Sequence, residues 1–192
     1  MRQTRTGAFT LVELLVVLAI LAVLAGLVGV GMWHTAERLR MKSAARTIVA
    51  LARYARAAAV AEGKTYRLCC DLDEGVVWLS APGDPETTGG EFVVVETEQT
   101  RPRKLPRGVR IRSVLAADQE PALTGEHHIS FGRDSSATRT VLHLEDSRRR
   151  VWTLHVAGST GEVKVYRFED EDVIPMYKSV EELEAGFYRQ AV

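Results

Sequence analysis

The residues from Phe9 to Met32 form an almost uninterrupted apolar run, FTLVELLVVLAILAVLAGLVGVGM, and this run constrains the fold more than any other stretch of the chain. As an α-helix rising about 1.5 Å per residue it would be roughly 36 Å long, enough to cross a hydrocarbon core of about 30 Å. Its one charged residue is Glu13. An acidic side chain at the centre of a membrane helix costs roughly 2.5–3.5 kcal/mol, and less towards the interface, so Glu13 calls for a specific explanation.

The apolar run has two simple interpretations. It is either an ordinary membrane anchor, with Glu13 reaching the headgroups, or a signal peptide whose charged region contains Arg2 and Arg5. The run is much longer than the roughly 7–15 apolar residues of a signal peptide, and the small residues that could form a cleavage site precede it instead of following it. The sequence therefore argues against a signal peptide.

Gly7, Ala8, Phe9 and Glu13, followed at once by LLVVLAIL, form a distinctive pattern at the start of the run. The pattern resembles the signal of type IV pilins and type II secretion pseudopilins. The resemblance implies that a prepilin peptidase cuts after Ala8, that the new N-terminal Phe9 is N-methylated, and that Glu13, fifth in the mature chain, serves assembly. The family usually has Gly directly before the cut, so cleavage after Gly7, which would make Glu13 sixth, is the alternative.

The helix is expected to continue past the apolar run, because residues 33–62 lack proline and are rich in Ala, Leu, Arg and Val. Gly63 is the first strong stop signal, since Gly is the commonest residue after a helix C-terminus. We divide the helix into a transmembrane half, residues 9–33, and an amphipathic half, residues 34–62. The second half is expected to press a stripe of mostly small side chains against a sheet, formed by Ile48, Leu51, Ala52, Ala55, Ala58 and Ala59.

The opposite face of this helical segment is expected to be basic, with Arg38, Lys42, Arg46, Arg53 and Arg56. Such a face is either a solvated surface or a contact for lipid phosphates, for acidic partner subunits or for nucleic acid. Further basic residues favour the nucleic-acid interpretation: Arg101, Arg103, Lys104, Arg107, Arg110, Arg112 and Arg148–Arg150. The acidic tail and the lack of aromatic residues clustered near the arginines weigh against it.

Residues 64–168 change to alternating periodicity and predict an antiparallel β domain. The expected strands span residues 66–69, 76–79, 92–95, 127–131, 139–144, 151–156 and 162–168, the last four arranged as an antiparallel meander. A surface loop is expected at 80–90, and the later part of residues 101–114 is expected to be extended. The fold class is therefore α+β: a long N-terminal helix, its first half transmembrane, packed on one or more antiparallel β-sheets. The resemblance to pilins implies a pilin-like arrangement of these elements. The tail, residues 169–192, begins with Glu169–Asp172, and the capping-box spacing from Ser179 predicts a short terminal helix.

Residues that could carry catalysis or bind a metal do not form a convincing group. His127 and His128 are adjacent, so they point to opposite faces of a strand, as do Cys69 and Cys70, for which we expect one core residue and one surface thiol. Asp71, Asp73 and Gly75 echo the start of a calcium loop but lack its downstream ligands, which favours a hairpin turn. We expect no catalytic, cofactor-binding or metal site, and no enzyme activity.

Two longer stretches, ALARYARAAAVAEGKTYRL and ISFGRDSSATRTVLHLEDSRRRVWTLHVAGSTGEVKV, resemble the H-type (GspH/FimT-type) minor pseudopilins and pilins. The resemblance implies a structural subunit of a type II secretion pseudopilus. The alternative is a FimT-like minor pilin of a type IV pilus that binds DNA during uptake. The implied partners are the prepilin peptidase, other pseudopilins or pilins, and inner-membrane lipid.

The resemblance also implies a single-pass protein of the bacterial inner membrane, with residues 1–8 on the cytoplasmic side and the β domain outside. The number of basic residues on each side of the apolar run does not favour this orientation. Arg2 and Arg5 precede the apolar run, whereas Arg38, Arg40, Lys42 and Arg46 follow it, and positive residues tend to stay inside. We give the resemblance precedence over the count.

Overall fold

The computed structural model describes residues 11–117 and 120–168. The chain divides into two compact units, residues 1–39 and 40–192. The helix α1, Leu11–Glu62, belongs to the first unit up to Leu39 and to the second from Arg40 onwards. The expected leader, residues 1–8, and the expected terminal helix after Ser179 lie outside the described residues.

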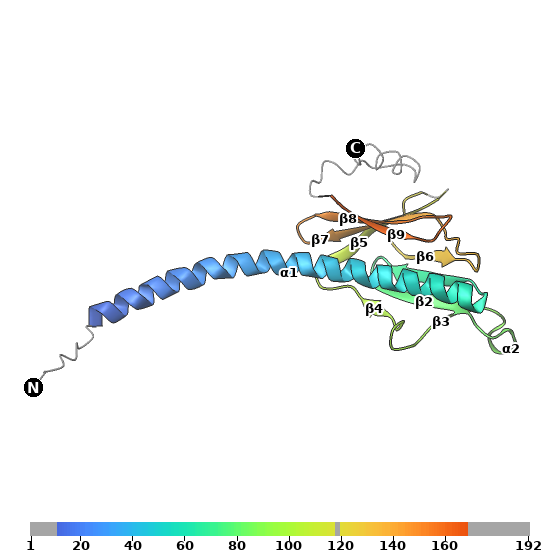
Figure 1. The fold of residues 1–192 in the computed structure, drawn as a ribbon, viewed down its shortest axis with the longest axis horizontal. Helices are drawn as coiled ribbons and strands as arrows, with labels where there is room; N and C mark the ends of the chain where they lie inside the picture. Colours follow the sequence, from blue (N-terminus) through green and yellow to red (C-terminus); the bar gives the residue numbers. More distant parts are fainter. Residues whose placement is uncertain (1–10, 118–119, 169–192) are drawn as a thin grey trace, which may run out of the picture. The chain divides into compact units, whose positions relative to one another are not determined.

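The second unit contains two antiparallel sheets (Figure 1). Sheet A has the order β3-β2-β1-β6, and β4 pairs with the same edge of β2 as β3 does, further along the strand. Its strands are β1 (Tyr66–Asp71), β2 (Val76–Pro82), β3 (Phe92–Val94), β4 (Arg103–Lys104) and β6 (Glu126–Phe131). Sheet B has the order β5-β7-β8-β9, with β5 (Val109–Ala116), β7 (Thr140–Asp146), β8 (Val151–Val156) and β9 (Val163–Phe168).

The second half of α1 provides one wall of the core. Its buried residues recur every three or four positions: Met41, Ala44, Ala45, Ile48, Leu51, Ala52, Ala55 and Ala59. They form one cluster with the inward residues of both sheets, such as Leu68 of β1 and Leu142 of β7. Because most of these helix residues are alanines, the helix backbone can approach the strands closely.

The end of α1 is fixed to β1 by the glycine stop and by a side-chain hydrogen bond. Gly63 has φ 65°, a conformation that favours glycine after a helix. Three residues later, Tyr66 Oη donates to Glu62 Oε1 at 2.9 Å. Burial first, and the bond to Glu62 second, raise the pKa of Tyr66 to about 12. Tyr66 therefore keeps its proton at neutral pH and can donate this hydrogen bond.

Most expected strands are confirmed, but of the four strands expected to form a meander only β7, β8 and β9 pair in chain order. β6 leaves the order of the chain and pairs with β1, where Leu68 faces Ile129, whereas β5 joins sheet B. The loop at 80–90 also contains a short helix, α2 (Pro85–Thr88), capped by Asp84, whose side chain accepts from the amide of Glu86 at 3.0 Å. Alternating periodicity identifies strands but not their partners, because every inward face is equally apolar.

The described part of the chain contains no helix that is long and apolar enough to cross a membrane, so the span expected over residues 9–33 is not confirmed.

Enlarging a stripe alanine tests the close packing of α1. Ala55 is 0% exposed, so Ala55→Leu forces extra methylene groups into a filled core and is expected to destabilise the protein by about 1–3 kcal/mol. The matched control is Ala57→Leu on the exposed side of the same turn. Urea unfolding of the full-length protein measures both. Equal stabilities for the two variants would contradict the packing described.

Candidate assembly site

The first unit presents an apolar helix surface that nothing in the described chain covers. Every side chain from Leu11 to Leu24 is exposed, and Glu13 is the one residue among them that is not apolar. Leu11 is 75% exposed and Leu15 58%. A continuous apolar surface of this kind marks contact with a membrane or with another protein. This segment is therefore the first candidate for a functional site.

Glu13 lies in the first turn of α1 and is exposed. A carboxylate in this position interacts favourably with the partial positive charge of a helix N-terminus. The carboxylate also gives the otherwise apolar surface a single point of electrostatic specificity, which a cation on another molecule can recognise. The expected processing residues Gly7, Ala8 and Phe9 lie outside the described residues.

A second candidate surface is a basic flank on α1 in the second unit, formed by Lys42, Arg46, Arg53 and Arg56. The first three are exposed and Arg56 is half-buried. Within the described residues no acidic group pairs with any of the four. Arg38, the fifth basic residue expected here, is exposed but belongs to the first unit.

The expectation that these cations lie opposite the buried stripe is wrong. At about 100° per residue, the centre of the basic flank is only about a third of a turn from the centre of the buried stripe. Arg56 consequently lies close to the β domain. Its Cδ is so near Gly161 that a Cβ added to that glycine would be only 3.3 Å from it. An open groove of about 520 Å³ beside it is lined by Arg53, Arg56, Ala57, Val60, Ala61 and Ser135.

Several basic residues after position 100 are already paired with acids. Lys104 Nζ lies 3.4 Å from Glu74 Oε2, and Arg110 Nη2 lies 2.9 Å from Glu145 Oε2. Arg150 binds Asp146, with Nε to Oδ2 at 2.7 Å. Glu145 and Asp146 are only 4% and 6% exposed. Two of these cations therefore satisfy buried carboxylates, which reduces the positive surface available to nucleic acid.

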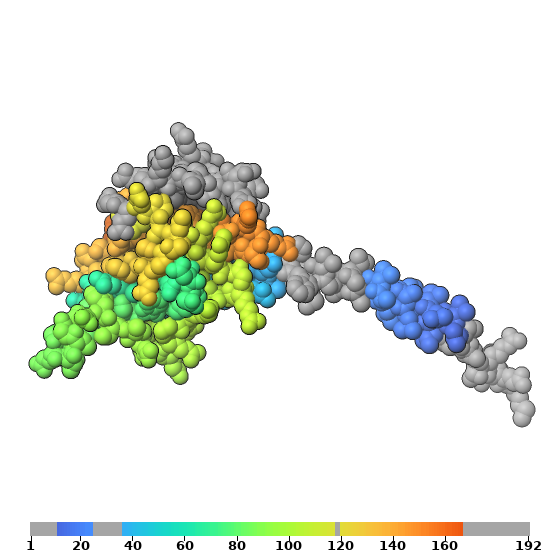
Figure 2. Space-filling model, turned by 180° about the vertical axis from the view of Figure 1, so that it is seen from behind, coloured from blue at the N-terminus to red at the C-terminus, as the bar shows by residue number. Residues whose placement is uncertain are grey.

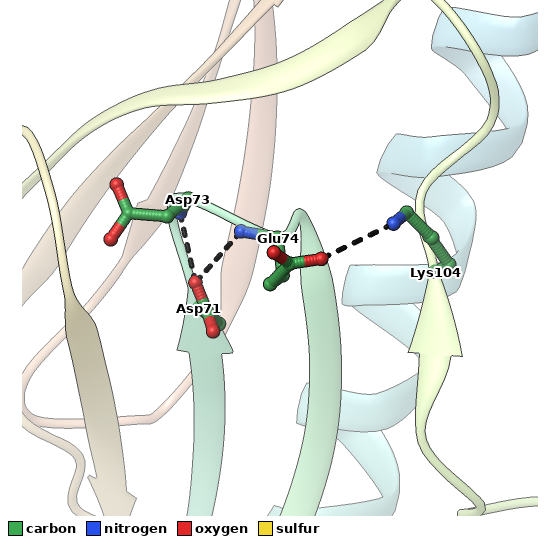
Figure 3. Close-up of polar contacts among 4 residues, drawn as sticks. All are labelled: Asp71, Asp73, Glu74 and Lys104. Carbon is green, nitrogen blue, oxygen red and sulfur yellow. Dashed lines mark hydrogen bonds and ion pairs between the residues drawn. The ribbon is translucent and has the colours of Figure 1, made fainter.

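The turn from Asp71 to Gly75 is a structural turn that joins three segments of the chain. Asp71 Oδ1 accepts from the amides of Asp73 and Glu74 at 2.8 and 2.9 Å, and Lys104 approaches Glu74 from β4 (Figure 3). On its other side, Asp73 Oδ2 accepts from the amide of Gly125 at 2.9 Å. The carboxylates expected to echo a calcium loop thus bind main-chain amides, as in the hairpin interpretation.

Both cysteines lie on β1, whereas the histidines of the β domain are divided between β6 of sheet A and β7 and β8 of sheet B. Cys70 is buried at 1% exposure, whereas Cys69 is half-buried on the other face of sheet A, with its Sγ 3.3 Å from Ser80 Oγ. Burial raises the pKa of both thiols, that of Cys70 to about 12. Figure 2 shows the molecule from behind the view of Figure 1, and residues of sheet A are found in it by their teal and green colours. Across the described residues, no three His, Cys, Asp or Glu side chains group closely enough to hold a metal ion.

Sequence reasoning missed the acidic residues buried at the end of β7. Asp146 Oδ1 accepts from the amides of Arg148 and Arg150 at 2.9 and 3.0 Å, so this carboxylate organises the turn into β8. The sequence EDSRRR reads as a charged surface turn. The one available signal was the Asp-Ser pair, because an Asp side chain often binds main-chain amides two residues further on.

Comparison with known proteins gives two family matches. Residues 4–29 match the prokaryotic N-terminal methylation motif, and residues 44–160 match the family described as type II transport protein GspH. No curated protein matches the chain.

Two solved structures share the fold. The minor pseudopilin EpsH from the type 2 secretion system of Vibrio cholerae is 13% identical, with a TM-score of 0.50, over 68% of this chain and 98% of that chain. The solution structure of E. coli GspH is 13% identical, with a TM-score of 0.51, over 71% and 93%.

His143 is expected to make stability depend on pH. Burial, and secondly Arg112, lower its pKa to about 4, and its Nδ1 lies 2.9 Å from Thr153 Oγ1. Because the unfolded chain binds this proton more tightly, the stabilisation is complete above about pH 6.5 and is lost as the pH falls towards 4, by roughly 2–3 kcal/mol. His143→Asn keeps a hydrogen-bonding group near Thr153 and should remove the part of the pH dependence of stability that comes from His143. Urea unfolding of both proteins from pH 7.5 to 4.5 measures the free energy of unfolding at each pH. If it falls equally in the two proteins, His143 does not make this contribution.

Proposed function

Because the chain belongs to the GspH family of type II transport proteins, we propose that it works as a minor pseudopilin, a structural subunit of a type II secretion pseudopilus. The observation that carries this function is the exposed apolar segment from Leu11 to Leu24 with its single carboxylate. Such a segment needs a bilayer before assembly and neighbouring helices after it. The absence of an enzyme activity is part of the same proposal.

Processing would prepare this segment for assembly. The N-terminal methylation motif at residues 4–29 supports removal of the leader by a prepilin peptidase. Cleavage after Ala8 would make Phe9 the methylated N-terminus and Glu13 the fifth residue. Cleavage after Gly7 would leave Ala8 at the N-terminus and is the alternative.

Glu13 would determine how neighbouring subunits align. Inside a bundle of apolar helices its carboxylate is costly unless a cation pairs with it, and the N-terminal amine of Phe9 on a neighbouring subunit is the partner that the resemblance implies. Any axial slip between subunits would leave one of the two charges unpaired. The pair would therefore select one register along the filament.

In this proposal the protein is held in the bacterial inner membrane by the N-terminal half of its helix, and the β domain faces outward. Its partners are the prepilin peptidase, other pseudopilins and inner-membrane lipid. The family relationship supports membrane attachment and assembly with other pseudopilins. The single span and its orientation belong to the proposal.

Glu13→Gln is expected to reduce incorporation into the pseudopilus at least about tenfold, because the neighbouring amine loses its counter-charge. Membrane extraction should be unchanged. Recovery of the protein with other pseudopilins after detergent extraction measures incorporation. Intact mass on the same sample checks that the chain starts at methylated Phe9.

Glu37→Gln, the same chemical change later in α1, is the control and should incorporate normally. Glu13→Asp should restore part of the incorporation, since it keeps the charge. Normal incorporation of Glu13→Gln, in a correctly processed chain, would exclude this role.

A second candidate function is that of a FimT-like minor pilin that binds DNA. The basic flank of α1 favours it, because Lys42, Arg46, Arg53 and Arg56 have no acidic partner in the described chain. Pairing of Lys104, Arg110 and Arg150 with carboxylates weighs against it. Four phosphate contacts give only weak binding that falls steeply with salt.

We therefore expect no gel shift of duplex DNA by the full-length protein in detergent at about 150 mM salt, because the counterions then compete with four cations. The variant Lys42→Gln/Arg46→Gln is the control for any binding seen at low salt and should abolish it. A shift that persists at physiological salt and is lost in this variant would favour the pilin function instead.

A further inference from the structure

The open groove of about 520 Å³ near the end of α1 combines exposed apolar side chains with two arginines, and we call it the arginine groove. Val60 is 49% exposed, and Ala57 and Ala61 beside it are exposed as well. Arg53 and Arg56 have no acidic partner in the part of the chain that the structure describes. Exposed apolar side chains next to unpaired cations suit a partner that is both acidic and apolar.

A surface of the complementary kind lies at and after β3, an edge strand of sheet A. Val93 and Val94 are 40% and 44% exposed there. Glu96 and Glu98, which follow, are exposed, and no cation among the described residues pairs with either carboxylate. We call these four residues the acidic edge. It offers unpaired carboxylates beside apolar side chains, the counterpart of the arginine groove.

The acidic edge is held in one conformation by a buried hydroxyl group. Thr100 is 0% exposed, and its Oγ1 donates to the carbonyl of Val95 at 2.6 Å and accepts from the amide of Thr97 at 3.1 Å. Arg103 Nη2 donates to the main-chain carbonyl of Glu98 at 3.4 Å, so it holds the turn and leaves the carboxylate available. A turn fixed in this way loses little conformational entropy when it binds.

The two surfaces lie on opposite flanks of α1. A second groove places Glu98 beside Thr47 and Tyr54 of the helix. At about 100° per residue, these two helix residues lie on one side of the buried stripe and the arginine groove lies on the other. Figure 1 shows β3 and β4 below α1 and β6 above it. One copy can therefore use its acidic edge and its arginine groove at the same time.

We propose that the acidic edge of one copy of this chain docks into the arginine groove of a second copy. The carboxylates of Glu96 and Glu98 pair with the two guanidinium groups, and the valines of β3 lie against Val60. Because the two surfaces differ, the contact is head-to-tail and can repeat along a row of copies.

The spacing of the charges agrees with this contact. Residues three apart on a helix, such as Arg53 and Arg56, have Cβ atoms about 5–6 Å apart. Residues two apart, such as Glu96 and Glu98, have Cα atoms at most about 7 Å apart. Both ion pairs can therefore form together. Exposed pairs contribute under about 1 kcal/mol each, so the contact is a weak one that weakens further as salt rises.

Charge reversal on each surface of the full-length protein tests the contact. The two variants are Arg53→Glu/Arg56→Glu in the groove and Glu96→Arg/Glu98→Arg in the acidic edge. Each is expected to lower the self-association constant about tenfold or more, because like charges then face each other. Sedimentation equilibrium in density-matched detergent at low salt measures this constant. Association through the apolar helix segment is common to all variants and does not affect the comparison.

Mixing the two variants separates a head-to-tail contact from a self-complementary one. The groove variant keeps a normal acidic edge and the edge variant keeps a normal groove, so an equimolar mixture should associate although neither variant does so alone. Lys42→Glu/Arg46→Glu, the same charge change about three turns earlier on α1, is the matched control and should behave as the wild type. A mixture that associates no better than its components, or a wild type no stronger than the groove variant, would overturn the proposal.

Arg53→Glu alone keeps the test valid if Arg56→Glu disturbs the packing near Gly161. Arg53 is exposed, so its reversal leaves the core intact and should lower the self-association constant about threefold. An unchanged constant in this variant would also count against the contact. Incorporation into a filament does not enter any of these readouts, so their outcome is independent of the proposed function.

Discussion

The close approach of α1 to the β domain is the constraint on which the second unit depends. The alanines at positions 44, 45, 52, 55 and 59 are buried, and their small side chains let the helix backbone pack closely against the strands, with no space for larger side chains. Both sheets contribute to the cluster behind that surface. The same helix also carries the exposed apolar segment and the basic flank, so the element that closes the core presents the surfaces available for assembly as well.

Residue pattern predicted the elements well where one physical effect dominated. The stop at Gly63, the hairpin at Asp71–Gly75 and the stripe through Ile48 and Ala55 depend on local backbone conformation or on helical periodicity, and the structure confirms them. The division into two sheets was not predictable, because strand pairing is decided by contacts far apart in the sequence. Met41, Ala44 and Ala45 were missed since their stretch also contains Arg40, Lys42 and Arg46, which obscure the apolar period.

Electrostatic roles were the hardest to predict from composition. The chain has equal numbers of basic and acidic residues, which says nothing about which of them pair. In the structure, the buried carboxylates of Glu145 and Asp146 pair with Arg110 and Arg150, while the cations of the basic flank have no such partner in the described chain. Arginines that look equivalent in the sequence therefore divide into those that hold the fold together and those available to another molecule. Only the second kind belongs in a candidate site.

The pairing of β1 with β6 also affects how the protein can mature in a cell. These strands are far apart in the chain, yet Leu68 and Ile129 are direct neighbours. During translation α1 leaves the ribosome first, and its alanine stripe has no complete sheet to cover it until β6 has been made. The exposed apolar segment of α1 is therefore made while the strands that follow it are still unfolded. Until the later strands exist, the growing chain exposes apolar side chains that the finished β domain buries, and such transient exposure favours aggregation.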